Sequence, residues 1–488
     1  MKILKIITDL LGKGETQEKI IAKNTGWLIF GEILSYTIRF VWIVYVTRIL
    51  GAYEYGKFAF AMGFVSLFVI FSDLGLSLII TREFSQNKEE EKHFSSILVL
   101  KIVLSILTLA IMTAGAFLIT KDSFLRQMMF ILGIVAILDY FPEIFYSFLR
   151  ARQQMKYEFF GKIIRSLSLA VIGFVIIFKF PTVRGASFAY LIACALTLFI
   201  IWLFFHLKFH NIKLVWDSRK WKQILLLAWP LAMVGIFSTI YSQLDSSIMG
   251  YLGQIIQVGW YGAAYRIIGV LMIPINLIAF AFFPALSVSF KKSQEKLKRI
   301  YARFMQTMIF ISFPLMTVGV ALASKIIRWL YGEPFLPGVF AFQILLIMAA
   351  VSYLISPLIM MSTVINQHKK TFWFTMIGAV ANLILNIIFI PKYSLNAASI
   401  TTLISVLIVL VLFIIFGMKR KYFTVFNKEI LFTLGYVVAA SGITFLILKN
   451  HYIHNLHVLI GCLIGAIAYV LIFYILWKIF NPLLKKIN

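Results

Sequence analysis

The sequence predicts an all-α protein that crosses a membrane about fourteen times. Hydrophobic residues make up 61% of its 488 residues and charged residues 13%, whereas a typical soluble chain is about 25% charged. Apolar runs follow one another along nearly the whole chain, each close to the roughly 20 residues that a helix needs to cross the hydrocarbon layer. A backbone in lipid must satisfy its hydrogen bonds internally, and unbroken runs of this length favour helices over the alternating strands of a β-barrel.

The predicted spans divide into two groups of six and a final pair. They lie near residues 25–47, 58–81, 96–119, 128–149, 159–178, 185–206, 224–249, 259–285, 304–323, 338–362, 372–390, 397–417, 430–448 and 457–477. We therefore expect an N-lobe within 24–206, a cytoplasmic linker at 207–223, a C-lobe within 224–417 and a C-terminal helix pair within 430–478.

The N-terminal segment 1–23 is basic and apolar. Its first eleven residues have apolar side chains at helical spacing and no small-residue cleavage site before the first span. This pattern favours a short interfacial helix on the cytoplasmic face over a cleaved signal. A frayed tail is the alternative.

A short pattern recurs between the first two spans of each lobe. Leu50-Gly51, followed by Gly56, has a counterpart in Leu252-Gly253, followed by Gly259. A six-span unit repeated in one orientation predicts two lobes around a central cavity, with a binding site between them.

Basic residues alternate in number from loop to loop. With Met1 on the cytoplasmic side, 31 of the 46 lysines and arginines fall in cytoplasmic segments, 10 in outward loops and 5 within spans. Such a bias sets orientation, so we expect both termini in the cytoplasm. The net charge of +27 then reflects topology and contact with anionic membrane lipids, and nucleic-acid binding is not needed to explain it.

Several motifs stand in order along the chain. They are Arg48-Ile-Leu-Gly51, Tyr55-Gly56, Asp73-Leu-Gly-Leu76, Arg82-Glu83, Gly259-Trp-Tyr-Gly-Ala-Ala-Tyr-Arg266, Leu330-Tyr-Gly-Glu-Pro-Phe-Leu-Pro337, Asn366-Gln-His-Lys-Lys370, Asn382-Leu-Ile-Leu-Asn386, Ile390-Pro-Lys-Tyr393 and Ala397-Ala398. Together they closely resemble the polysaccharide (O-antigen and capsule) flippases of the multidrug/oligosaccharidyl-lipid/polysaccharide (MOP) exporter superfamily. Ser394-Leu-Asn396 departs from the glycine usual at that loop.

The resemblance implies a non-enzymatic transporter in the cytoplasmic membrane. Its cargo would be an oligosaccharide linked through diphosphate to a polyprenol, moved from the inner to the outer leaflet by alternating access. It also implies a functional monomer without cofactors, with the last two spans lining a groove for the lipid tail.

Arg39 and Arg266 are the first candidates for binding the diphosphate. Charges within a span are costly and usually face a bundle interior or a wet cavity, and an arginine fork suits phosphate oxygens. The two arginines lie at matching depths of corresponding lobes. Asp245, at similar depth, is expected to orient one of them. For the arginines the alternatives are structural ion pairs with Glu32, Asp73 or Asp245 and snorkelling to the outer interface. For Asp245 the alternative is coupling to H⁺ or Na⁺.

A second polar layer lies nearer the cytoplasm. Its members are Asp73, Lys101, Asp139, Glu143, Lys162 and Arg165. Lys162 and Arg165 share a helix face, where they would receive the diphosphate at the inner leaflet. Ion pairs with Asp139 or Glu143 are the alternative, and Asp73 stays a candidate substrate contact.

Asn382 and Asn386 are four residues apart on one helix face. They are candidates for contacting sugar, and hydrogen bonding between helices is the alternative. We find no catalytic or nucleotide-binding motif. His451, His454 and His457 lie together in an outward loop, where a solvated loop explains them better than a metal site, and Cys194 and Cys462 are expected to be buried free thiols.

Two other functions fit the same sequence. A cation-coupled drug or metabolite exporter would share the scaffold and depend on carboxylates such as Asp73 and Asp245. A membrane-embedded glycan polymerase or glycosyltransferase would need a sizeable extramembrane loop, and the outward loops are short.

Overall fold

The computed structural model describes residues 17–209, 215–418, 428–450, 453 and 456–485. Every regular element in these ranges is a helix and none is a strand. The chain divides into two compact units, residues 1–256 and 257–488. The interfacial helix expected at Met1–Leu11 lies outside the described residues.

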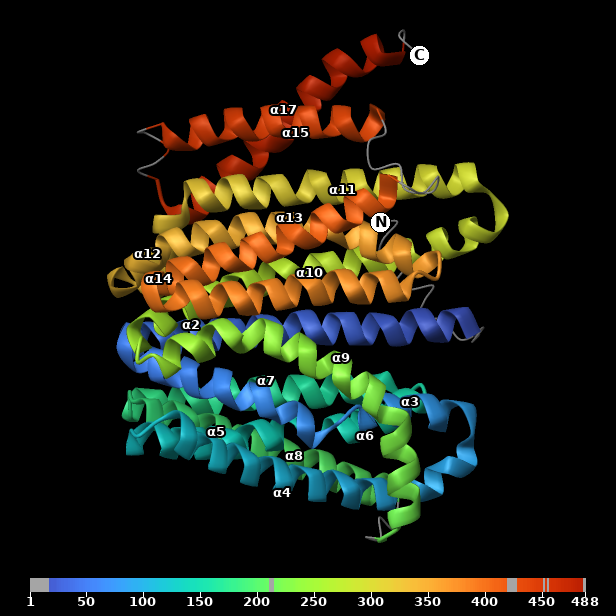
Figure 1. The fold of residues 1–488 in the computed structure, drawn as a ribbon, viewed down its shortest axis with the longest axis vertical. Helices are drawn as coiled ribbons and strands as arrows, with labels where there is room; N and C mark the ends of the chain where they lie inside the picture. The colour runs from blue at the N-terminus through green and yellow to red at the C-terminus, as the bar shows by residue number, and fades with distance from the viewer. Residues whose placement is uncertain (1–16, 210–214, 419–427, 451–452, 454–455, 486–488) are drawn as a thin grey trace. The chain divides into compact units, whose positions relative to one another are not determined.

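The first unit holds long helices with two short interruptions (Figure 1). Its elements are α2 (Gln17–Val69), η1 (Ile70–Ser72), α3 (Leu76–Gln86), η2 (Lys88–His93), α4 (Phe94–Ile119), α5 (Ser123–Tyr140), α6 (Glu143–Ala151), α7 (Met155–Lys179), α8 (Val183–Phe209) and α9 (Ser218–Tyr251).

The second unit is also built from helices. Its elements are α10 (Ile255–Lys292, which begins at the unit boundary), α11 (Gln294–Ala321), α12 (Ala323–Tyr331), η3 (Glu333–Gly338), α13 (Val339–Val364), α14 (His368–Met418), α15 (Lys428–Lys449) and α17 (Val458–Lys485).

Eleven helical stretches in the described residues are long and apolar enough to cross a membrane. Two of them, Lys23–Gln86 and His368–Met418, contain a kink at Gly51 or Ser394 where two helices meet, and α9 is not among the eleven. The predicted all-α membrane fold is confirmed, and the count of fourteen spans stays a prediction.

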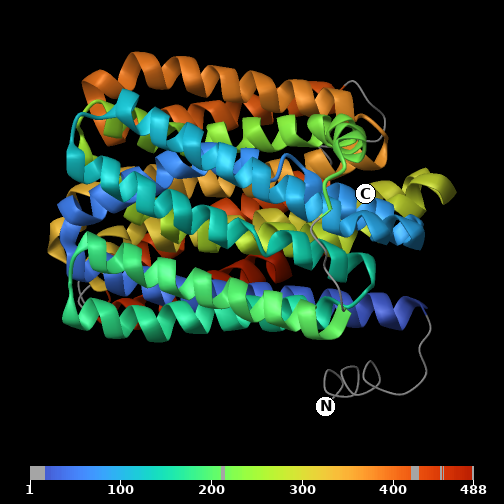
Figure 2. The ribbon, with the colours of Figure 1, turned by 90° about the horizontal axis from the view of Figure 1, so that it is seen from below.

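Within the first unit, α2 packs against α5 and α7, and α8 packs against the same two helices. Figures 1 and 2 show these helices running side by side. The last helix, α9, packs against α2, α3 and α4 and so belongs to this unit. The predicted linker at 207–223 was placed between the two sequence repeats, whereas the compact units divide after residue 256. The division into two functional lobes at 207–223 stays a prediction.

The glycine of the repeated turn motif has a positive φ in both places. Gly51 has φ +71° and Gly253 has φ +75°, values that glycine adopts without steric cost. Gly51 and Gly253, which the sequence motif pairs, are therefore alike in this backbone angle.

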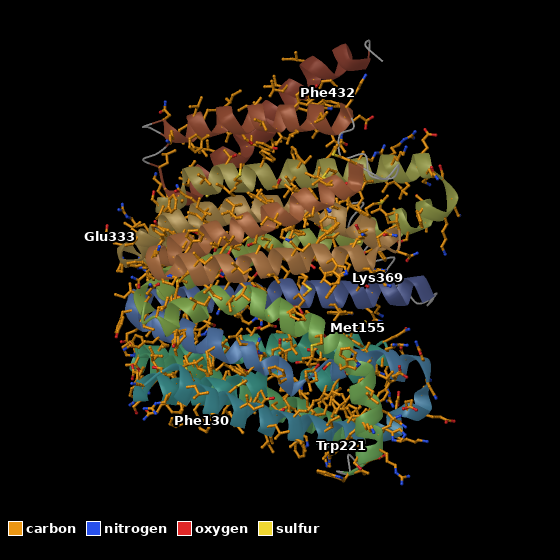
Figure 3. All side chains as sticks on the ribbon, viewed as in Figure 1. Phe130, Met155, Trp221, Glu333, Lys369 and Phe432 are labelled. Carbon is orange, nitrogen blue, oxygen red and sulfur yellow. The ribbon has the colours of Figure 1, made fainter. Side chains whose placement is uncertain are left out.

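Apolar side chains line the outside of the helices. Phe130 and Phe432, for example, are exposed to about the same degree (45% and 40%), and Figure 3 shows carbon-rich side chains along the helices. An exposed apolar surface of this extent suits contact with lipid.

Phenylalanines join four helices at one end of the first unit. The ring centroids of Phe145 and Phe205 are 4.6 Å apart, and those of Phe94 and Phe148 are 4.8 Å apart. With Phe84 they form a buried cluster that holds α3, α4, α6 and α8 together. This cluster fixes the short helices that carry the polar site.

Close approach of α2 and α7 depends on Gly173. A Cβ atom at this position would lie 2.4 Å from the ring of Trp42, which is completely buried. We expect Gly173→Ala to lower the free energy of unfolding by about 1–3 kcal/mol, because the overpacked ring must shift. Thermal unfolding in detergent measures the change. Gly26→Ala on α2, whose added Cβ would meet nothing within 4 Å, is the control; equal melting temperatures for the two variants would contradict the expectation.

Candidate functional site

The second predicted span is not continuous. After η1 the chain passes through Leu74 (φ +44°) and Gly75 (φ +79°) before α3 begins. Asp73 stands at this break. Its Oδ1 accepts a hydrogen bond from Ser77 Oγ at 2.7 Å and its Oδ2 accepts one from Ser77 N at 3.3 Å. The carboxylate therefore sits at the N-terminus of α3, where the helix dipole favours negative charge.

Lys101 of α4 completes the contacts of Asp73. Its Nζ lies 2.7 Å from Asp73 Oδ1, and its side chain is 0% exposed. A cation this deeply buried needs a paired anion, so Asp73 serves here as the partner of Lys101.

The fourth predicted span is also interrupted, at Phe141-Pro142 between α5 and α6. The two short helices that follow the interruptions, α3 and α6, pack against each other. Thr81 Oγ1 joins them by donating to the carbonyl oxygens of Ser77 and Ser147, at 2.9 and 3.3 Å. Broken helices within a membrane place polar backbone where a cavity or protein can satisfy it.

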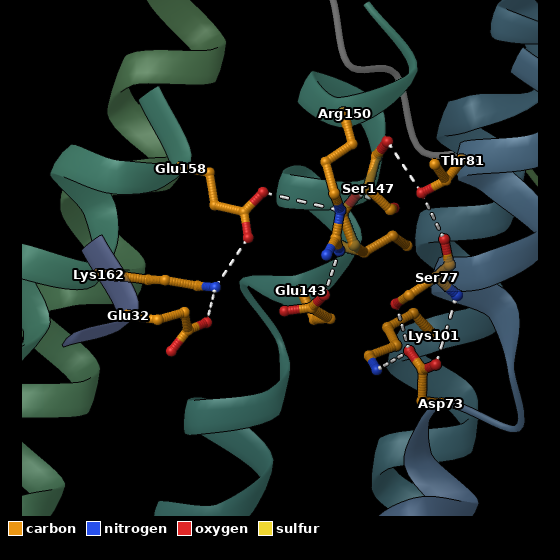
Figure 4. A network of polar contacts seen from close by, with 11 residues as sticks. Glu32, Asp73, Ser77, Thr81, Lys101, Glu143, Ser147, Arg150, Glu158 and Lys162 are labelled. Atoms are coloured by element: carbon orange, nitrogen blue, oxygen red, sulfur yellow. Dashed lines mark hydrogen bonds and ion pairs between the residues drawn. The ribbon is translucent and has the colours of Figure 1, made fainter. Parts of the chain in front are cut away.

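Five charged side chains of alternating sign form a line across α6, α7 and α2 (Figure 4). Glu143 pairs with Arg150, whose Nε lies 3.7 Å from Glu158 Oε2. Glu158 Oε1 lies 2.9 Å from Lys162 Nζ, and Lys162 pairs in turn with Glu32. We call these five residues the charge chain. It contains three carboxylates and two cations.

Arg165 forms an ion pair, which was the predicted alternative to a free cation that binds the diphosphate. It pairs with Asp139 of α5, and its NH2 group lies 2.5 Å from Asp139 Oδ2. The buried Cys194 thiol contacts the same carboxylate at 3.8 Å. Lys162 differs from the expectation, because its partners are Glu32 and Glu158 rather than Asp139 or Glu143.

Arg39 differs from the other in-span cations of the first unit. Its Nε donates to the carbonyl oxygen of Ser35 at 3.3 Å, and its guanidinium lies over the Tyr36 ring, 5.4 Å from the centroid. Within the described part of the chain it forms no ion pair with a carboxylate within 4 Å. Its electrostatic neighbours include Arg165, Asp139 and Glu32. Arg39 is thus half-buried near other charged side chains, and within the described residues its Nε donates a hydrogen bond to a backbone carbonyl rather than to a carboxylate.

Asp245 and Arg266, the other candidates predicted at the depth of Arg39, belong to different units. Asp245 is buried on α9 of the first unit, and Arg266 is exposed on α10 of the second. The cavity that we expect Arg39 and Arg266 to share therefore stays a prediction.

Asn382 and Asn386 lie in a buried polar cluster of α14. Asn386 donates to Asn382 Oδ1 at 3.1 Å, and Asn382 donates to Thr402 Oγ1 at 3.4 Å. Thr401 Oγ1 donates to Asn386 Oδ1. These contacts join the two halves of α14 across the kink at Ser394, as the alternative of hydrogen bonding between helices predicts.

Two members of the charge chain were not among the sequence candidates. Glu158 and Arg150 fall just outside the predicted spans 128–149 and 159–178, in the predicted loop between them. The spacing of Glu158 and Lys162, four residues apart, was the available signal, since such a pair meets on one helix face.

Among the described residues, no three His, Cys, Asp or Glu side chains gather where they could hold a metal ion. Two of the loop histidines, His451 and His454, lie outside the described ranges.

Comparison with known sequences identifies the family. Residues 21–290, more than half of the chain, match the profile of the family described as "Polysaccharide biosynthesis protein". The chain belongs to this polysaccharide biosynthesis protein family. The family predicted from the motifs is confirmed.

Two relatives are similar over most of their length. The capsular polysaccharide biosynthesis protein CapF of Staphylococcus aureus is 21% identical over 399 residues, which cover 80% of this chain and 98% of that protein. The probable low-salt glycan biosynthesis flippase Agl15 of Haloferax volcanii is 23% identical over 397 residues, which cover 79% of this chain and 81% of that protein.

Solved structures share the fold of this family member. The lipid II flippase MurJ in an inward closed conformation superposes with a TM-score of 0.74 and 17% identity, over 94% of this chain and 99% of that one. An inward-facing multidrug resistance transporter of the MATE family, from the MOP superfamily, gives a TM-score of 0.64 and 14% identity, over 79% and 94%. The chain is therefore a multi-pass membrane protein with a MOP-type fold.

Proposed function

We propose that this protein flips a polyprenyl-diphosphate-linked oligosaccharide from the inner to the outer leaflet of the cytoplasmic membrane, for cell-surface polysaccharide biosynthesis. It would work by alternating access of two lobes, as a monomer and without chemical catalysis. The distribution of lysine and arginine favours cytoplasmic termini.

Family membership and the relatives support this class of cargo. One relative is named as a capsular polysaccharide biosynthesis protein and another as a probable glycan biosynthesis flippase. The lipid II flippase MurJ is the solved structure with the higher TM-score of the two compared. Each of these names concerns polysaccharide, glycan or lipid-linked cargo, which is why we favour a lipid-linked oligosaccharide over a drug.

The state of Arg39 is the observation in the molecule that carries the proposal. Lys101, Arg150, Lys162 and Arg165 each pair with a carboxylate. Within the described chain Arg39 has no carboxylate within 4 Å; it donates to a carbonyl oxygen and lies over an aromatic ring. A half-buried guanidinium that has no carboxylate within 4 Å in the described chain favours an anionic ligand, and its planar fork matches two phosphate oxygens. We propose that Arg39 and Arg266 bind the diphosphate and that Asp245 orients one of them.

The other predicted site residues take supporting roles in this proposal. Arg165 and Asp73 form structural ion pairs. Asn382 and Asn386 form hydrogen bonds that join the two halves of α14. Membrane lipids contact the apolar exterior, and coupling to H⁺ or Na⁺ stays a prediction.

Complementation of a strain that lacks its own polysaccharide flippase tests the function. Expression of this chain should restore surface glycan and remove the accumulated lipid-linked intermediate, which mass spectrometry of extracted lipids quantifies. Strains that differ in the glycan they make would show which cargo is accepted.

Two outcomes would favour a different function. Unchanged accumulation of the intermediate, together with resistance to cationic drugs that depends on Asp245, would favour the exporter. Longer lipid-linked glycans without export would favour a polymerase.

A further inference from the structure

Glu32 is the accessible end of the charge chain. Its side chain is 49% exposed, whereas that of Lys162 is 21% exposed and that of Glu158 is 0% exposed. Because Lys162 also contacts Glu158 at 2.9 Å, it keeps one carboxylate partner if Glu32 moves away. Glu32 can regain water on release, whereas a separated Glu158 would be a buried, uncompensated charge. Glu32 is therefore the partner that Lys162 can exchange.

Glu32 also lies close to the cation proposed for the diphosphate. Glu32 and Arg39 are seven residues apart on α2, which places them on one face two helical turns apart. Lys162 lies on α7, which packs directly against α2. Arg39 interacts electrostatically with Glu32 itself. The cations of α7 on this side are Arg165, which interacts electrostatically with Arg39 and pairs with Asp139, and Lys162, which pairs with the more exposed Glu32. A ligand with two phosphates held at Arg39 would thus meet Lys162 as a cation held by an exposed side chain of the same charge sign as the ligand.

We propose that Glu32 is an internal counter-anion that the substrate's diphosphate displaces from Lys162. Glu32 holds Lys162 while the site is empty, and a phosphate oxygen takes its place when the headgroup binds. Return of Glu32 then helps the headgroup to leave, which a transporter needs because binding must be weak enough for release. The inference rests on the proposed function, and it adds a residue that sets how tightly the substrate is held.

Binding of inorganic pyrophosphate to the full-length chain in phosphatidylcholine nanodiscs tests the inference by isothermal titration calorimetry. Glu32→Gln should bind pyrophosphate about five- to tenfold more tightly than the unmodified chain, because the competing charge is gone. Glu143→Gln is the matched control. It makes the same change at the other end of the charge chain, where the carboxylate pairs with Arg150, and should leave the affinity within twofold.

A double variant separates this role from a structural one. Lys162→Gln should weaken pyrophosphate binding, and adding Glu32→Gln to it should have no further effect, because the contested cation is absent. Unchanged or weaker binding in Glu32→Gln, or an equal gain in the Lys162→Gln background, would overturn the inference. Thermal unfolding of each variant shows whether the fold is kept.

The two proposals fail in different assays. A chain that complements export but binds no pyrophosphate in any variant overturns the role of Glu32 and leaves the function standing. If the variants show the expected pyrophosphate affinities but the chain does not complement export, the role of Glu32 as a counter-anion stands and the proposed cargo is wrong.

Discussion

Arg39→Ala is expected to reduce glycan export by about two orders of magnitude while the protein still folds and inserts. Losing a desolvated charged contact costs about 2–5 kcal/mol of binding free energy, and each 1.4 kcal/mol is tenfold. Stability should change little, because Arg39 forms no carboxylate ion pair within the described chain. Export is measured in the complemented strain as surface glycan and as accumulated lipid-linked intermediate.

Two variants sharpen this test. Arg39→Lys keeps the charge but loses the planar fork, so export should recover only partly. Arg184→Ala, which removes an exposed arginine of α8 that contacts Gln127, should export normally. Arg266→Ala is expected to behave like Arg39→Ala. Full export in both alanine variants would remove these arginines from the site.

Much of the fold was predictable because the thickness of the hydrocarbon layer sets the length of an apolar run that crosses it. The expected spans at 338–362 and 430–448 correspond to α13 (Val339–Val364) and α15 (Lys428–Lys449). The breaks near Leu74 and Phe141 were not predicted, since an apolar run gives no sign of where the backbone leaves the helix. Leu74 adopts a positive φ that is uncommon for leucine.

The site was predictable as a set of residues but not as a set of pairs. All six members of the predicted second polar layer take part in ion pairs. Yet Lys101 and Asp73 are 28 residues apart in the sequence, and Lys162 and Glu32 are 130 residues apart. Such partners depend on how helices pack, which residue spacing does not encode. That Arg39 has no carboxylate within 4 Å among the described residues follows only from the packed structure, in which the nearby carboxylates pair with other cations.

Breaking the buried pair of Lys101 and Asp73 should be the most damaging change to stability. Lys101→Met leaves the Asp73 carboxylate without its cation, and we expect a loss of about 3–5 kcal/mol in the free energy of unfolding. Asp73→Asn should be similarly harmful, because Lys101 is 0% exposed and would be left as a buried cation without its carboxylate. Unfolding in mixed detergent and dodecyl sulfate measures both changes.

The double variant Asp73→Asn with Lys101→Met removes both charges and should recover much of that loss, since no uncompensated ion remains. The matched control is Lys57→Met. Lys57 lies 2.7 Å from Glu54, whose side chain is 39% exposed and can be hydrated, so the cost should stay below about 1 kcal/mol. Additive losses in the double variant would mean that Asp73 and Lys101 act separately, with Asp73 stabilising α3 through Ser77 alone. Recovery of stability without recovery of export would instead show that the charges at the broken helix are needed for transport as well as for folding.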